Sequence, residues 1–139
     1  VTAWMGVLDI PTGKVEFANA GHNPPLVKHA DGTFEYLKSK PGFVLAGMEG
    51  IRYRKNELFL APGDAIYLYT DGVTEATDAD NALYGEKRLC TLLNGLHGLS
   101  GEDICQAVKN DIDAFVGSAP QFDDITMLYL KYNGGTKNA

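Results

Sequence analysis

The chain has 139 residues, of which 45% are hydrophobic and 22% charged, and its formal net charge is −6 at pH 7. This length suits one domain with a sizeable core. The acidic balance argues against nucleic acid as a partner, because no basic patch is available to displace counterions from phosphates. No stretch approaches the roughly 20 apolar residues of a membrane span, so no membrane contact is expected in this segment.

The first half of the chain predicts a meander of antiparallel strands. The turn signals Pro11–Lys14 and Asp31-Gly32 predict two hairpins, and Pro62-Gly63 precedes a further strand. A loop rich in Gly and Pro is expected at Ser39–Gly50. The six predicted strands span residues 2–10, 15–20, 26–29, 33–37, 52–60 and 65–70.

The second half changes to helical spacing. After a polar loop at 74–84, leucines from Leu89 to Leu96 predict a helix that Gly98 closes. Ser100 is expected to cap a second helix, which Gly117 ends. A last strand is predicted at 123–131, and residues 133–139 are expected to form a disordered tail outside the domain at 1–132.

Cysteine and histidine usage gives no sign of a zinc site. Cys90 and Cys105 fall on predicted helices without CxxC spacing, and reduced core thiols suit a cytoplasmic protein. His22, His29 and His97 are scattered along the sequence. We expect turn or surface roles for these histidines.

Two carboxylates are placed to meet at one rim of the sheet. Asp71 ends one predicted strand, next to Gly72, and Asp123 begins another. The two helices between them predict an antiparallel hairpin, so the returning strand should run antiparallel to the one that was left. Opposed residues on neighbouring strands have Cβ atoms only about 5 Å apart.

Uncompensated carboxylates this close repel each other, so a cation between them is one solution. A hard divalent cation fits best, since no Cys or His joins the group. The alternatives are that Asp71-Gly72 is only a turn dipeptide, and that Asp123 or Asp124 caps its strand or pairs with a lysine. If Asp71-Gly72 is only a turn, the chain could be an unrelated β-rich domain that binds a ligand.

Four motifs follow one another along the chain: Asn19–Leu26, Leu68–Ala76, Tyr84–Leu89 and Phe122–Thr126. In this order and spacing they resemble the motifs of one family, the bacterial metal-dependent Ser/Thr phosphatases of the PPM type, in their stage-II-sporulation-E branch. The resemblance runs from about Val1 to Leu130.

The resemblance implies an α+β fold, a mainly antiparallel β-sandwich flanked by helices, with two Mn²⁺ or Mg²⁺ ions at one end. It implies that Asp71 and Asp123 are metal ligands, that Gly72 keeps the ligand loop tight, and that Asp124 is a neighbour of the site. His22 is assigned to loop structure. No catalytic residue beyond the metal ligands is implied.

The sequence departs from the family pattern at its start. An earlier motif, in which an Asp bridges both metals, does not precede Val1. We therefore expect a C-terminal portion of a catalytic domain that lacks its first strands and helices. Weak metal binding and little activity are expected of it alone, and its exposed sheet edges favour a homodimer.

The implied reaction is hydrolysis of phosphoserine or phosphothreonine on a regulatory protein, such as an anti-anti-sigma factor, by a water that two metal ions activate. The absence of a nucleophilic Cys or Ser motif agrees with a mechanism without a covalent intermediate. The alternative is a catalytically inactive PPM-like module that binds partners.

Overall fold

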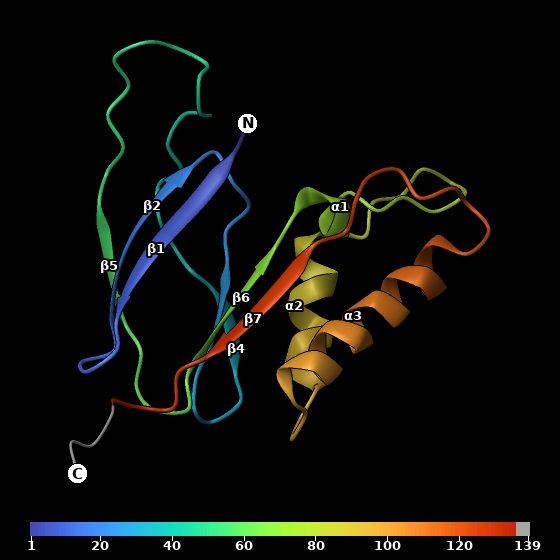
Figure 1. Cartoon of the computed structure of the whole chain (residues 1–139). Helices are drawn as coiled ribbons and strands as arrows, with labels where there is room; N and C mark the ends of the chain where they lie inside the picture. Colours follow the sequence, from blue (N-terminus) through green and yellow to red (C-terminus); the bar gives the residue numbers. More distant parts are fainter. Residues whose placement is uncertain (136–139) are drawn as a thin grey trace.

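Two antiparallel sheets and a layer of helices make up the fold, which we describe from a computed structural model that covers residues 1–135 (Figure 1). Sheet A has the strand order β1-β2-β5, and sheet B has the order β4-β3-β6-β7. The strands are β1 (Ala3–Asp9), β2 (Lys14–Ala20), β3 (Leu26–Lys28), β4 (Phe34–Tyr36), β5 (Asn56–Phe59), β6 (Ala65–Tyr69) and β7 (Met127–Lys131). The helices are α1 (Asp71–Thr74), α2 (Gly85–Gly95) and α3 (Gly101–Val116).

Sheet B is covered on both faces, and this gives the domain two cores. Between the sheets, six buried side chains pack together, from β2, β3 and β6 and from the residues that follow β5 and β7. Against the helices, buried tyrosines of β6 pack on the stripes of α2 and α3. The inter-sheet core consists of Val15, Phe17, Val27, Leu60, Ile66 and Tyr132. The second core includes Leu26, Tyr67, Tyr69, Leu89, Leu93, Ile104, Val108 and Ile112.

The helices are fixed by polar contacts as well as by their apolar stripes. The hydroxyl of Ser100 accepts a hydrogen bond from the backbone N–H of Asp103, which confirms the predicted cap of α3. On α2, the Asn94 side chain accepts from the N–H of Phe34 at 2.8 Å and donates to its carbonyl at 3.0 Å. Asn94 therefore occupies the free edge of β4 as a further strand would.

Several boundaries differ from the sequence prediction. Strand β5 has four residues where nine were expected. Its pairing with β2 stops at Phe17, and further along β2 the carbonyl of Asn19 accepts a hydrogen bond from the N–H of Gly42 instead. The polar loop is preceded by the short helix α1, and β7 begins only at Met127. Of the expected tail, residues 133–135 contain no helix or strand, and 136–139 lie outside the described residues.

The sandwich is open along one side, where β1 and β7 are the outermost strands of their sheets within residues 1–135. A small apolar cavity lies there between Trp4 and Leu8 of β1 and Leu130 of β7. Leu128 and Leu130 are 55% and 39% exposed. An edge strand with apolar side chains and no proline is a template for pairing with another strand.

We therefore expect this chain to self-associate through β7. Sedimentation velocity over a concentration series should show a dimer, and Leu128→Lys should shift the equilibrium towards monomer because a charge on an edge strand opposes pairing. Leu83→Lys adds the same charge at an exposed leucine outside the strands and serves as the control. A wild-type chain that stays monomeric at high concentration would remove this idea.

Candidate metal centre

Four strand ends of sheet B meet at one rim. Because all neighbouring strands are antiparallel, the end of β6 and the start of β7 lie together, with Tyr69 opposite Met127. Asp71 directly follows β6 at the start of α1, and Asp123 lies shortly before β7. The predicted antiparallel return of the chain is therefore confirmed. We call Thr70–Gly72 together with Asp123–Thr126 the acidic rim.

Thr70 ties the two halves of the acidic rim together. Its N–H donates to the carbonyl of Thr126 at 3.0 Å, and its hydroxyl accepts from the N–H of Thr126 at 3.1 Å. The same hydroxyl oxygen lies 3.2 Å from the carbonyl of Asp124, to which it donates. Sequence reasoning missed Thr70, although a hydroxyl residue directly before the Asp-Gly pair was a usable signal.

Gly72 allows the two loops to approach more closely than any other residue could. It is buried within α1, and a Cβ at this position would overlap the carbonyl oxygen of Asp124 and lie 2.9 Å from its carbonyl carbon. Its backbone φ is not in the left-handed region, so lack of space, and not conformation, requires glycine here. The close approach is consistent with the part that the family resemblance implies for Gly72, which is to keep the loop tight.

The three carboxylates of the rim are exposed. The Asp123 carboxylate accepts from the N–H of Asp124 at 2.7 Å, and Gln121 donates from its side chain to the Asp123 carbonyl at 2.9 Å. Within residues 1–135, no group of three or more His, Cys, Asp or Glu side chains is close enough to hold a metal ion. The rim thus offers oxygen donors of the kind hard cations prefer, from two loops held together, but only part of a complete ligand set. The metal-binding roles of Asp71 and Asp123 remain predictions.

The motif at Asn19–Leu26 contacts the end of β6, directly before the acidic rim. The buried Asn19 side chain closes the loop by donating to the His22 carbonyl and accepting from the His22 N–H. The His22 Nε2 donates to the carbonyl of Tyr69 at 3.1 Å, since a carbonyl can only accept, and Nδ1 accepts from the Thr2 hydroxyl at 3.0 Å. His22 therefore joins sheet A to the end of β6, a structural role in a loop.

The motif at Tyr84–Leu89 fixes α2 against α3. Arg88 makes a two-point ion pair with Asp111, with Nε–Oδ2 at 2.9 Å and Nη2–Oδ1 at 3.0 Å. The Tyr84 hydroxyl donates to the same carboxylate at 2.6 Å. The guanidinium also stacks over the rings of Tyr84 and Phe115. These hydrogen bonds, above all those from Arg88, hold the pKa of Asp111 below its usual range.

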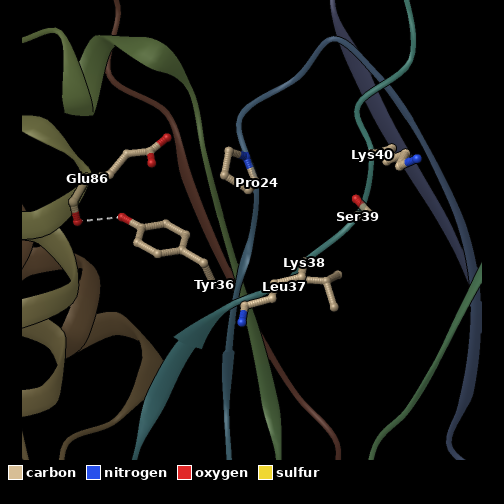
Figure 2. Close-up of a pocket in the computed structure, with 7 residues that line it drawn as sticks. All are labelled: Pro24, Tyr36, Leu37, Lys38, Ser39, Lys40 and Glu86. Carbon is tan, nitrogen blue, oxygen red and sulfur yellow. Dashed lines mark hydrogen bonds between the residues drawn. The ribbon is translucent and has the colours of Figure 1, made fainter.

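An open groove of about 580 Å³ lies beside the acidic rim, between the end of β4 and the start of α2 (Figure 2). The Tyr36 hydroxyl donates to the Glu86 carbonyl at 2.6 Å on one side of the groove (Figure 2). Pro24 lies between Tyr36 and the segment that carries Ser39 and Lys40 in this view. Burial raises the pKa of Tyr36, so its phenol stays protonated. Asn23 connects this groove to α1, with its amide 3.5 Å from the Thr74 hydroxyl.

Solved structures share this fold. The SiaA-PP2C domain of Pseudomonas aeruginosa superposes with a TM-score of 0.78 at 25% identity, over 94% of this chain and 51% of that one. The phosphatase domain of SpoIIE from Bacillus subtilis, described as presoaked with Mn, gives a TM-score of 0.75 at 15% identity, over 99% of this chain and 59% of that one. The architecture is therefore that of PP2C-type phosphatase domains, of which the chain covers roughly half.

Sequence comparison identifies the family. The profile of Stage II sporulation protein E (SpoIIE) matches residues 1–133, and the chain belongs to this family of PP2C-type Ser/Thr phosphatases. Protein IcfG of Synechocystis sp. (strain ATCC 27184 / PCC 6803 / Kazusa) is 32% identical over 95% of the chain, and phosphoserine phosphatase RsbU of Bacillus subtilis (strain 168) is 28% identical over 94%. The chain spans 20% and 38% of the lengths of these two relatives. Within residues 1–135, no helix has the length and apolarity that crossing a bilayer requires.

Proposed function

We propose that this chain contributes to the hydrolysis of phosphoserine or phosphothreonine on a regulatory protein, with Asp71 and Asp123 as ligands of a two-cation site. The observation that supports this most is the acidic rim, where Thr70 and Gly72 hold the two carboxylate-bearing loops against each other. The description of the relative RsbU as a phosphoserine phosphatase supports the reaction class.

The residues of the rim have distinct parts in this proposal. Asp71 and Asp123 provide oxygen ligands, and Gly72 keeps α1 close to the loop that carries Asp123. Asp124 is nearby but is not assigned as a ligand. Two Mn²⁺ or Mg²⁺ ions, when bound, would activate a water and neutralise the phosphate oxygens. Because the described residues hold only part of a ligand set, the remaining ligands have to come from water or from outside them.

The test is the binding of Mn²⁺ to the chain and to three variants. Binding to the native state should raise the melting temperature and add about 2.7 kcal/mol to the free energy of unfolding at a hundredfold excess over Kd. Asp71→Asn and Asp123→Asn each remove one charged ligand at nearly constant volume. We expect both to abolish this Mn²⁺-dependent stabilisation, measured by calorimetry.

Asp124→Asn is the matched control, because it removes a charge from the neighbouring residue and should leave the Mn²⁺ effect in place. Release of phosphate from a phosphoserine peptide, measured in the same four proteins, is expected to be low throughout, because the described residues hold only part of a ligand set. Equal Mn²⁺ stabilisation of wild type and Asp71→Asn would contradict the assignment. So would a loss confined to Asp124→Asn.

A further inference from the structure

A second pocket lies at the end of sheet B opposite the acidic rim. The β3–β4 turn, the β5–β6 turn and the connection between α2 and α3 converge there around a cavity of about 380 Å³. Each connection contributes a glycine to the lining, and these residues, Gly32, Gly63 and Gly98, all have positive φ. The turns therefore bring no side chain at these positions into the space. We call this cavity the far-rim pocket.

Two lysines of the far-rim pocket stand on the same face of sheet B. Lys28 of β3 and Lys131 of β7 both lie opposite Ala65 of β6, so all three side chains point towards the helices. Strands two positions apart are separated by about 10 Å, a span that two lysine side chains can close around a single ligand. The Lys28 ammonium lies over the ring of Phe34 on β4, 5.7 Å from its centre, so it has to turn towards β6 to share a ligand with Lys131.

The charges around the far-rim pocket favour an anion. Within residues 1–135, Lys28 and Lys131 have no ion-pair partner, which is also true of Lys38, Lys40 and Lys87, whereas Lys14, Lys55 and Lys109 each pair with a carboxylate. One carboxylate, Asp31, also lines the pocket, but its Oδ1 already accepts from the N–H and hydroxyl of Thr33. His97 also lines the pocket and can donate from its ring. Two lysines against one carboxylate leave the pocket positive in a chain with a net charge of −6.

We propose that the far-rim pocket binds a phosphate-type oxyanion between Lys28 and Lys131, with His97 as a further donor. Ammonium groups and imidazole N–H groups are strong donors to phosphate oxygens. The oxyanion is either free inorganic phosphate or the phosphoryl group of a phosphorylated side chain. Free phosphate is the product that a phosphatase releases. If the ligand is instead a phosphorylated side chain, the far-rim pocket would bind a phosphorylated protein. The proposal is independent of the metal-binding function assigned to the acidic rim.

The test is an NMR titration of the ¹⁵N-labelled chain with sodium phosphate, in EDTA and against sodium chloride of equal ionic strength. Saturable shifts are expected at the amides of Gly32, Gly63 and Gly98. Lys28→Gln and Lys131→Gln should each weaken binding roughly tenfold, the usual order for losing a hydrogen bond to a charged group. A parallel titration with a phosphoserine peptide distinguishes the two sources, and binding of either one supports the proposal.

Two controls separate this pocket from the acidic rim. Lys38→Gln removes an exposed lysine near the groove at the other end of sheet B and should leave phosphate binding unchanged. Asp71→Asn should also leave it unchanged, whatever its effect on Mn²⁺. Shifts no larger than those caused by sodium chloride would overturn the proposal. Phosphate binding that requires Mn²⁺ and disappears in Asp71→Asn would overturn it too, while supporting the metal centre.

Discussion

Gly72→Ala is expected to cost about 3 kcal/mol of the free energy of unfolding, the upper end of the range for overpacking a well-packed site. The added methyl group would overlap the carbonyl oxygen of Asp124 and approach its carbonyl carbon to 2.9 Å. Both atoms belong to the backbone, so no side chain can turn away to make room. The loop carrying Asp123 would have to move, and the hydrogen bonds between Thr70 and Thr126 would lengthen with it.

Gly95→Ala is the matched control for this substitution. Gly95 also lies in a helix, α2, but a Cβ there would meet no atom within 4 Å. Alanine should therefore be neutral or stabilise the helix by up to about 1 kcal/mol. Urea unfolding monitored by circular dichroism measures both variants. A Gly72→Ala protein as stable as Gly95→Ala would show that the two loops of the acidic rim are not packed as described.

The acidic rim shows how far sequence reasoning reaches. The antiparallel return from Asp71 to Asp123 could be predicted, because the strand pattern, two helical stripes and a short connection leave few other paths for the chain. The hairpins and the Ser100 cap followed from local turn and capping chemistry. These features depend on residues close together in the sequence or on a periodic pattern.

The contacts that complete the rim depend instead on residues far apart in the sequence. Thr70 bonds to Asp124 and Thr126, and His22 bonds to Thr2 and Tyr69. Each bond joins segments that are far apart in the sequence, and a threonine or histidine in a loop has many possible partners. The same is true of Asp111. From the sequence it is expected to be an exposed carboxylate on a helix, and only the structure shows that Arg88 of α2 lies beside it.

Removal of the Arg88–Asp111 ion pair is the second change expected to lower the stability of the fold strongly, and this loss depends on pH. Asp111→Ala should cost about 2 kcal/mol at pH 7, because it leaves the guanidinium between two rings without its counterion and the buried Tyr84 hydroxyl without its acceptor. This loss of unfolding free energy is smaller than for a fully buried ion pair, because the Arg88 side chain is 44% exposed and water partly screens the charges.

The sign of the pH dependence follows from the lowered pKa of Asp111. A carboxylate whose pKa is lower in the folded state stabilises the fold above its unfolded pKa, about 3.9 for Asp. That stabilisation is lost as the pH falls through the folded pKa. The difference in unfolding free energy between wild type and Asp111→Ala should therefore be largest at neutral pH and shrink as the solution is made more acidic than about pH 4. Asp113→Ala, on the exposed side of the same helix, is the control and should change the unfolding free energy much less at pH 7. If the destabilisation by Asp111→Ala were the same in acid as at pH 7, the ion pair could not be its cause.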